Sequence, residues 1–380
     1  MIFWVLSVGI LTLYYLCFLF YVLYGFIRLK LISIKQDINI KDKFISILIP
    51  FRNEAENILK NLKSIQNINY DIDKYEVIYI NDHSTDNSVE LLKANIKNGN
   101  IKVINCPTET GYEQGHKKIA VNFGINNAKG EIIFTTDSDC IVPVEWVNTM
   151  LVNFNDNTAF VSGPVNFVSN ETLWSKLQQI EFAGLVLAGG GLIAAGRPTI
   201  CNAANIAFKK SVFFEVGGYS DNMNLSSGDD ELLMQKISTN IYWDVNFCYN
   251  KLSVVSTSPN KTIAEFYNQR KRWASKGTHY KNKLLVFALI LIYLFFLSFP
   301  LQIVGAIFLN KYLLLSFILS FSVKAFFEYL IIKKGKNILF AKIETKVFII
   351  AELLHVPYIL LAGFLGLFGN FKWKGRQLKR

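Results

Sequence analysis

The order of hydrophobic and polar positions divides the chain into three regions. Residues 2–27 are almost wholly apolar, residues 43–252 alternate short apolar runs with amphipathic ones, and long apolar segments return from residue 284. About 20 consecutive apolar residues are enough to cross a bilayer as a helix. The pattern therefore predicts a membrane helix first, an α/β domain next, and membrane helices last.

The middle region is typical of strands that alternate with helices. Apolar runs predict strands at 44–49, 76–80, 101–104 and 131–136, and amphipathic runs predict helices at 56–66, 86–97 and 117–127. We expect Pro50 to end the first strand. This alternation indicates βαβ units, and so a mostly parallel sheet with helices on both faces.

A second pattern begins near residue 159. Residues 160–165 predict a strand and a turn, and residues 173–182 predict a helix. The run 183–196 is rich in Gly and Ala and is too short to span a bilayer. Three interpretations of this run stay open: contact with the membrane, the lining of an apolar acceptor path, or a buried core loop.

The last region holds three segments long enough to span a bilayer, at 284–309, 312–332 and 347–369, whereas 339–346 is typical of an interfacial helix. Lys and Arg gather beside the apolar segments, at 28–30, 281–283, 333–334 and 372–380. Basic residues flank membrane helices on the cytosolic side, so we expect the amino terminus outside and the middle region in the cytosol. Strict alternation would put the basic tail outside, which leaves open that one segment is re-entrant.

Composition narrows the class of protein. Of the 380 residues, 51% are hydrophobic and 14% aromatic, and the mean hydropathy is +0.28, which excludes an ordinary soluble protein. The net charge of +11 lies mainly beside the apolar segments, so we expect no nucleic-acid partner. The five cysteines form no CxxC pair, so we predict neither a disulfide framework nor a zinc site.

Two carboxylates stand at the end of one predicted buried strand. Residues 131–136 lead directly to Asp137, Ser138 and Asp139. The carboxyl end of a strand is where an α/β sheet presents its ligand site. Two oxygen donors one residue apart can share a divalent cation that holds a diphosphate. For this triplet alone, a solvated surface turn is the alternative.

Polar residues also follow the neighbouring predicted strands. Residues 50–54 follow the first strand, and residues 82–86 follow the second. Asp82 can accept hydrogen bonds from a nucleotide base or a ribose hydroxyl, and the alternative is a helix-capping turn. Lys117 begins a predicted helix and can approach a phosphate, although a solvated lysine has the same pattern.

Two further polar stretches lie later in the chain. Three consecutive acids, Asp229, Asp230 and Glu231, precede an apolar helical face. Their like charges repel one another, which raises the pKa of at least one of them, and a raised pKa suits a general base. A helix N-terminus favours acids at the same place. The second stretch is 269–273, in which Arg272 can neutralise a diphosphate and Trp273 can stack on a sugar. A headgroup anchor beside the membrane is the alternative there.

With these motifs in this order, the chain resembles the family 2 glycosyltransferases. The resemblance is to the membrane-embedded branch, which includes cellulose, hyaluronan and chitin synthases and ceramide-glucosyltransferase-like enzymes. It covers residues 44–273 and, more loosely, the membrane segments after them. The residues that carry it are Pro50, Arg52, Glu54, Asp82, Lys117, Asp137, Ser138, Asp139, Asp229, Asp230, Gln269, Arg272 and Trp273.

The resemblance implies a GT-A-type nucleotide-binding domain that transfers a sugar from a nucleotide diphosphate, usually UDP. Asp82 matches the uracil-contacting acid. Asp137 and Asp139 match the pair that binds Mg²⁺ or Mn²⁺, with Asp139 as the expected direct ligand. The other residues expected at the donor are Pro50, Arg52, Glu54, Lys117, Ser138, Gln269, Arg272 and Trp273.

On the acceptor side, Asp230 matches the base that deprotonates the acceptor hydroxyl. Asp229 stands where the family more often has Glu, and Trp273 is expected to contact the acceptor as well. One base without a second carboxylate nucleophile implies direct displacement with inversion at the sugar carbon.

The resemblance also implies a plan of five parts. They are an N-terminal transmembrane helix (1–28), a cytosolic catalytic domain (43–255), an interfacial segment with the QxxRW motif (260–283), C-terminal transmembrane helices (284–371) and a basic tail (372–380). We expect an integral protein of a bacterial inner membrane.

The leading hypothesis is therefore an inverting, metal-dependent glycosyltransferase that uses a UDP-sugar and acts on a lipid or lipid-linked acceptor. Only about three membrane segments follow the catalytic domain, which is few for a channel that conducts a polymer. A processive polysaccharide synthase with a glycan acceptor is the alternative. A catalytically silent scaffold that binds nucleotide sugars is an alternative of another class, but Asp230 and Arg272 argue against it.

Overall fold

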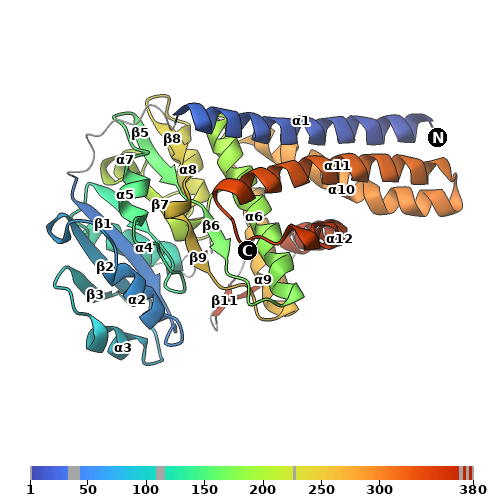
Figure 1. Cartoon of the computed structure of the whole chain (residues 1–380). Coiled ribbons are helices and arrows are strands. Elements are labelled where there is room, and N and C mark those ends of the chain that lie inside the picture. Colours follow the sequence, from blue (N-terminus) through green and yellow to red (C-terminus); the bar gives the residue numbers. More distant parts are fainter. Residues whose placement is uncertain are drawn as a thin grey trace.

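The computed structural model of the chain describes residues 2–32, 43–107, 116–225, 228–367, 371–373 and 376–378. At the centre of the α/β domain is a seven-stranded sheet with the strand order β3-β2-β1-β4-β7-β5-β8 (Figure 1). Within this sheet only β7 runs antiparallel to its neighbours, β4 and β5, so the predicted mostly parallel sheet is confirmed. The strands are β1 (Ile45–Phe51), β2 (Tyr75–Asn81), β3 (Ile101–Asn105), β4 (Ile132–Thr135), β5 (Thr158–Ser162), β7 (Ile206–Lys209) and β8 (Asp244–Phe247).

The sheet carries one hydrophobic core on each face. Ile47 and Ile49 of β1 pack in one core with Leu62 of α2, whereas Leu48 packs in the opposite core with Ile125 of α4. A strand that is covered on both faces needs apolar residues at nearly every position, which explains the continuous apolar runs of β1 and β2. The helices of this domain are α2 (Ile58–Gln66), α3 (Ser88–Asn95), α4 (His116–Asn127), α5 (Trp146–Leu151), α7 (Lys210–Glu215) and α8 (Glu231–Ser238).

Contrary to the prediction, Pro50 does not end β1. The strand pairs with β2 as far as Phe51 but with β4 only as far as Leu48. The carbonyl of Leu48 accepts from Thr136 on the β4 side, and residues two apart point to the same side of a strand. The N–H that proline lacks would therefore face a side where β4 has already ended, so Pro50 costs the sheet no hydrogen bond.

Short elements join the sheet to the rest of the chain. A second small sheet pairs β6 (Val165–Phe167) with β9 (Val255–Thr257). Helix α9 (Ile263–Ala274), which carries the 269–273 stretch, begins with a capping box formed by Thr262 and Glu265. The 3₁₀ turns are η1 (Ile72–Lys74), η2 (Ala203–Asn205), η3 (Lys251–Ser253), η4 (Ser275–His279) and η5 (Thr345–Val347).

The Gly-rich and Ala-rich run is helical rather than a core loop. A single helix, α6 (Leu173–Ala194), begins at the capping side chain of Thr172 and includes both the predicted helix and most of this run. Its glycines allow a close crossing with α1 (Ile2–Ile32): a Cβ atom on Gly191 would lie 2.7 Å from the carbonyl oxygen of Val22. The backbones of the two helices can therefore touch only because this position has no side chain.

Long apolar helices extend from one end of the α/β domain. Helices α1, α10 (Lys283–Phe308) and α11 (Tyr312–Ile338) lie side by side, whereas α6 runs crosswise to them (Figure 1). By length and composition, five helices of the described chain could cross a membrane: these three, α6 and α12 (Phe348–Leu367). The amino-terminal end of α1 is the end remote from the sheet (Figure 1).

Both ends of α12 lie on the side of the α/β domain. Before α12 starts, Glu344 forms an ion pair with Lys176 of α6 at 2.6 Å. Near its end, Gly366 packs against Ala274 of α9. Strand β10 (Phe371–Trp373), which pairs with β11 (Arg376–Leu378), also lies against α9. Both ends of α12 thus contact the part of the molecule next to the α/β domain, as the open alternative of a re-entrant segment requires.

The predicted interfacial helix at 339–346 is wrong. Helix α11 ends where the carbonyl of Gly335 accepts from both Leu339 and Phe340, and turns lead from there to η5. After this point the backbone hydrogen bonds belong to turns, such as the one from the N–H of Ile343 to the carbonyl of Phe340, and no helix continues through 339–344.

Candidate active site

The predicted site residues meet where the order of the strands reverses. The chain builds β1, β2 and β3 outward in one direction and then returns to place β4 on the other side of β1. Such a switch point opens a crevice at the carboxyl ends of the strands. A cavity of about 990 Å³ lies there, and its lining includes all thirteen residues of the sequence-based site: Pro50, Arg52, Glu54, Asp82, Lys117, Asp137, Ser138, Asp139, Asp229, Asp230, Gln269, Arg272 and Trp273.

The loops after β1 and β2 brace each other. Nη1 of Arg52 donates to the carbonyls of Asp82 and His83, at 2.8 and 2.6 Å. Asn53 and His83 both have a left-handed backbone, with φ values of 51° and 57°. Asp82 is buried, and its Oδ1 lies 3.2 Å from Nδ1 of His83. In this structure Arg52 holds the loop that presents Asp82, and its contact with a donor stays a prediction.

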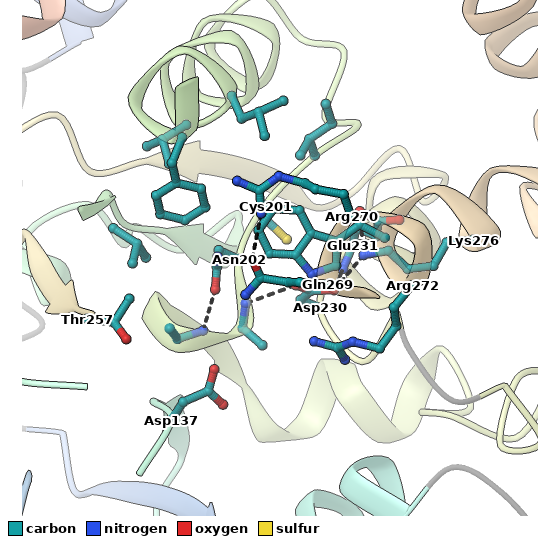
Figure 2. A pocket seen from close by; sticks show the side chains of 18 of the residues that line it. Asp137, Cys201, Asn202, Asp230, Glu231, Thr257, Gln269, Arg270, Arg272 and Lys276 are labelled. Carbon is teal, nitrogen blue, oxygen red and sulfur yellow. Dashed lines mark hydrogen bonds and ion pairs between the residues drawn. The ribbon is translucent and has the colours of Figure 1, made fainter. Parts of the chain in front are cut away.

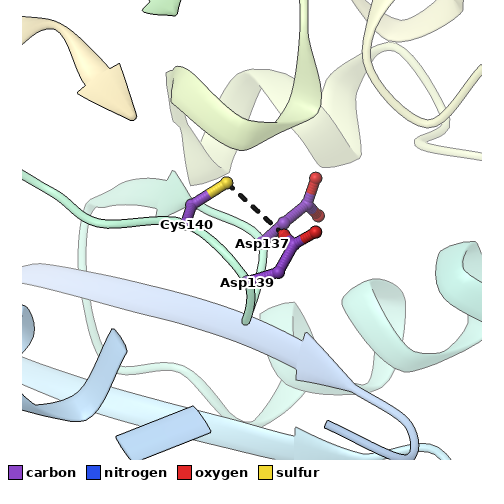
Figure 3. Close-up of side chains that lie close together, drawn as sticks. All are labelled: Asp137, Asp139 and Cys140. Carbon is purple, nitrogen blue, oxygen red and sulfur yellow. Dashed lines mark hydrogen bonds between the residues drawn. The ribbon is translucent and has the colours of Figure 1, made fainter. Parts of the chain in front are cut away.

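The loop after β4 carries the predicted metal ligands (Figure 3). Carboxylate oxygens of Asp137 and Asp139 and Sγ of Cys140 lie within 4.8 Å of one another. Two carboxylates suit a hard cation such as Mg²⁺ or Mn²⁺, which also takes oxygens from phosphates and water. Cys140 fits less well, because burial, followed by Asp139 and Asp137, raises the pKa of its thiol far above the ordinary value.

An asparagine holds this turn in place. Nδ2 of Asn61 in α2 donates to the carbonyls of Asp137 and Cys140, at 3.2 and 2.8 Å, and its Oδ1 accepts from the hydroxyl of Tyr79 at 2.7 Å. Asn61 is 1% exposed, so these bonds form in the core. A single amide in an amphipathic helix gave no sequence signal for this role.

Lys117 joins the two acidic stretches. Its Nζ lies 2.6 Å from Asp137 Oδ1 and 3.2 Å from Asp229 Oδ2. Burial by itself would raise the pKa of Asp229, but Lys117 and then Lys118 outweigh burial and hold this pKa below the ordinary value. Asp229 is therefore an ionised partner of a lysine in this structure.

Asp230 stands at the start of α8 with both carboxylate oxygens fixed. Oδ1 accepts from the backbone N–H of Glu231 at 2.7 Å, and Oδ2 accepts from the N–H of Ala203 at 2.9 Å. Figure 2 shows the carboxylate beside Lys276, whose Nζ is 3.9 Å away. Asp230 therefore caps α8 and also lines the cavity, and its role as a base stays a prediction.

Glu231 is the member of the acidic group whose pKa is raised. Its burial outweighs Lys276, 3.0 Å away, and the hydroxyl of Tyr280, which donates at 2.6 Å. Lys276 and Tyr280 also line the cavity and were missed from the sequence. Lys276 lies about one helical turn after Arg272, and this spacing could have suggested it. Nothing in the sequence singled out Tyr280.

Another missed lysine supports the same region. Lys118 is 1% exposed, and its Nζ donates to the carbonyls of Asn222 and Leu225, at 2.7 and 3.0 Å. Burial lowers its pKa to about 8, although Asp229 and Asp230 act in the opposite direction. The lysine thus anchors the backbone that precedes the acidic motif.

The residues of α9 point to different sides of the cavity (Figure 2). Among the described residues, the Arg272 side chain makes no hydrogen bond or ion pair, and its burial lowers its pKa in spite of nearby acids. Trp273 instead packs toward α6, with its ring 5.9 Å from that of Phe182. An arginine that lines a cavity without a protein partner can bind an anionic ligand there.

The cavity extends to the long helices α6, α10 and α12. They line it mainly with apolar side chains, together with two tyrosines: Leu185, Val186, Leu289, Ile292, Tyr293, Tyr358, Ile359 and Ala362. One cavity therefore connects the acids at the sheet edge with the long apolar helices.

Comparison with known proteins identifies the domain. Residues 46–217 match the family model described as glycosyl transferase family 2. The chain carries a family 2 glycosyltransferase domain. Together with the apolar helices packed on it, this match confirms the resemblance to the membrane-embedded branch of that family.

Relatives of this family 2 domain carry synthase names. The chain is 27% identical over 248 residues to poly-beta-1,6-N-acetyl-D-glucosamine synthase of Staphylococcus aureus (strain COL), covering 64% of this chain and 57% of the relative. The synthase of the same name from Staphylococcus epidermidis is 27% identical over 237 residues, covering 61% of this chain and 54% of the relative. The chain thus spans little more than half the length of these relatives.

A solved structure supports the GT-A-type fold. It is the mannosyltransferase PcManGT from Pyrobaculum calidifontis in complex with GDP-Man and Mn²⁺, which is similar over 96% of this chain and 99% of its own. The TM-score is 0.58 and the identity 16%, so the likeness concerns the fold.

Proposed function

We propose that this family 2 enzyme is an inverting, metal-dependent glycosyltransferase that moves a sugar from a nucleotide diphosphate, UDP in the leading case, to a lipid or lipid-linked acceptor. The observation that carries the proposal is the single cavity, which has Asp137, Asp139 and Arg272 at one part and apolar helices at the other. A charged donor and an apolar acceptor could meet between them, at Asp230.

The protein groups support a single displacement. The Asp230 carboxylate would take the proton of the acceptor hydroxyl, whose oxygen then bonds to the anomeric carbon as the bond to the diphosphate oxygen breaks. Arg272 would bind the negative charge left on the diphosphate. Lys117 lies 3.2 Å from Asp229 and would weaken that carboxylate as a second nucleophile, which favours inversion.

A divalent cation fits beside Asp137 and Asp139, where it would neutralise the diphosphate as a Lewis acid. The similar fold of a mannosyltransferase solved with Mn²⁺ is in keeping with this assignment. Lys117 lies against Asp137 at 2.6 Å, so it would hold the carboxylate when no cation is bound.

The side chains at the apolar end favour a lipid chain over a growing polysaccharide. Leu289 and Ile292 of α10 and Ile359 and Ala362 of α12 line the cavity and offer no hydrogen-bond partner to sugar hydroxyls. Of the described residues of these two helices that line it, only Tyr293 and Tyr358 carry a hydroxyl, and that of Tyr293 already donates to the carbonyl of Leu360. The basic residues 28–30, 281–283 and 333–334 flank α1, α10 and α11 at their ends near the α/β domain. By the positive-inside rule this end would be cytosolic.

A processive polysaccharide synthase is the second candidate, and the names of the curated relatives favour it. The size of the product separates the two. Membranes that contain the protein would be incubated with radiolabelled UDP-sugars and Mn²⁺, and the product would be extracted into organic solvent and sized. A single-sugar lipid product supports the proposal, whereas a long water-soluble polymer would replace it with the second candidate.

A further inference from the structure

Arg270 lies inside the 269–273 stretch but points away from Arg272 (Figure 2). Its side chain is 1% exposed and forks onto Glu181 of α6: Nε donates to Oε1 at 3.2 Å, and Nη2 donates to Oε2. Tyr358 of α12 lies beside this pair and interacts with both of its members. Three helices therefore fix the position of one guanidinium.

The remaining nitrogen of this guanidinium orients Gln269. Nη1 of Arg270 donates to Gln269 Oε1 at 2.6 Å, and Nδ2 of Asn260 donates to the same oxygen at 3.0 Å. Asn260 cannot be reversed, because its Nδ2 also donates to Oε1 of Gln178 at 3.1 Å. Only the oxygen of an amide can accept hydrogen bonds, so the atom of Gln269 that faces these two donors is its oxygen. The NH₂ group of Gln269 must then point the other way.

The NH₂ group of Gln269 is a donor without a protein acceptor. Gln269 lines the cavity, and no residue that the structure describes accepts a hydrogen bond from its Nε2. Its carbonyl has both lone pairs occupied, so the side chain can offer a ligand only N–H groups. Such a side chain suits an oxygen that carries lone pairs and no proton, as a diphosphate oxygen does.

The same guanidinium also holds the tryptophan of the motif. Its central carbon lies 4.2 Å from the ring centroid of Trp273 and 4.6 Å from that of Phe266. Stacking a buried cation on an aromatic face is favourable and fixes the ring in place. Arg270 is thus in contact with both predicted ligand-binding neighbours, while its own nitrogens are all engaged by protein.

We propose that Arg270 is a positioning residue that aims the amide donors of Gln269 at an oxygen of the nucleotide diphosphate. The proposal rests on the proposed function, since it takes the ligand of this cavity to be a nucleotide diphosphate. Lysine cannot replace arginine here, because one ammonium cannot form the fork on Glu181, reach Gln269 and stack on Trp273 together.

The test is a double-mutant cycle on the full-length protein, with the affinity for UDP in the presence of Mn²⁺ measured by calorimetry. We expect Gln269→Ala and Arg270→Lys each to weaken binding about tenfold, the loss of roughly one hydrogen bond to a charged oxygen. The double variant should be no more than about twofold weaker than either single one, because both remove the same contact. Lys271→Gln, on the same helix but outside the cavity lining, is the control and should bind UDP as the unchanged protein does.

Gln269→Glu keeps the shape and the oxygen that Arg270 holds, but it replaces the donor with a second acceptor. We expect it to remain folded and to lose at least tenfold in UDP affinity, and this variant covers the case in which Arg270→Lys does not fold. Additive effects in the cycle, or a Gln269→Glu variant that binds UDP normally, would overturn the proposal. Sugar transfer is measured separately. If UDP binding shows the expected coupling between Gln269 and Arg270 but no sugar is transferred, the proposed function is refuted and the role of Arg270 stands.

Discussion

The ion pair between Lys117 and Asp137 offers the sharpest test of how the site is held together. Removing the ammonium by Lys117→Met leaves Asp137 and Asp229 without their shared partner. The side chains of Lys117, Asp229 and Asp137 are 19%, 11% and 33% exposed, so water can replace only part of the lost interaction. Breaking such a buried pair from one side costs about 3–5 kcal/mol.

A matched control comes from the chain itself. Lys43 and Glu131 form an ion pair of the same length, 2.6 Å, but their side chains are 46% and 60% exposed. Exposed pairs of this kind contribute only about 0–1 kcal/mol. Lys43→Met should therefore change the unfolding temperature by little, whereas Lys117→Met should lower it by roughly 10 °C.

Both pH and metal should modulate the effect of Lys117→Met. The pKa of Asp229 is held low in the folded chain, so its pairing stabilises the fold above the ordinary pKa of 3.8 and loses that contribution as pH falls through the folded value. In the variant the freed acids can take up protons, so the gap to the unchanged protein should narrow from pH 7.5 to pH 5. Binding of Mn²⁺ should raise the free energy of unfolding of the variant by up to about 2.7 kcal/mol when its concentration is a hundredfold above its Kd.

The assay is thermal unfolding of the purified protein in detergent, in EDTA and in Mn²⁺, at both pH values. Equal unfolding temperatures for Lys117→Met and Lys43→Met in EDTA at pH 7.5 would refute the reasoning, because burial would then make no difference to the pair.

Three further variants test other parts of the account. Asp230→Asn should slow sugar transfer by about a hundredfold to ten-thousandfold and leave UDP affinity within twofold; unchanged turnover would remove Asp230 from the mechanism. Gly25→Ala should lower the unfolding temperature, because its Cβ would lie 1.9 Å from a carbonyl oxygen of α6, while Gly9→Ala, with no atom within 4 Å, should not. Lys324→Met should lower the free energy of unfolding by about 3–5 kcal/mol, since it removes the lysine that pairs with the buried Glu352 and with Glu328 in the helix bundle, and a variant as stable as the unchanged protein would contradict this.

The sheet edge was predictable because local patterns determine it. The apolar runs of β1, β2 and β4 are covered on both faces, and the polar residues that follow each run must then lie at one edge. The alternation of strands with helices predicted a parallel arrangement, and the turn of Asp137 to Asp139 followed directly from its strand. All thirteen predicted site residues line the cavity, although their individual roles stay predictions.

What the sequence missed depends on contacts between distant segments. Arg270 is one of several basic residues in a row, and only its burial against Glu181, 89 positions earlier, distinguishes it from Lys271. The path of α12 was equally hidden, because hydropathy gives the length of a segment but not the side on which it ends. Gly191 belongs to the run 183–196, whose role the sequence left open, and in the fold it allows α1 and α6 to touch.

The central claim is that a cation at Asp137 and Asp139 and the base at Asp230 act on a nucleotide sugar in one cavity. The most direct measurement is transfer of label from a panel of radiolabelled nucleotide sugars by the purified protein in lipid, with Mn²⁺ or EDTA, for the unchanged chain and for Asp139→Asn. The account predicts transfer from at least one UDP-sugar with Mn²⁺, and its loss in EDTA and in the variant. Equal transfer in EDTA, or by Asp139→Asn, would contradict it.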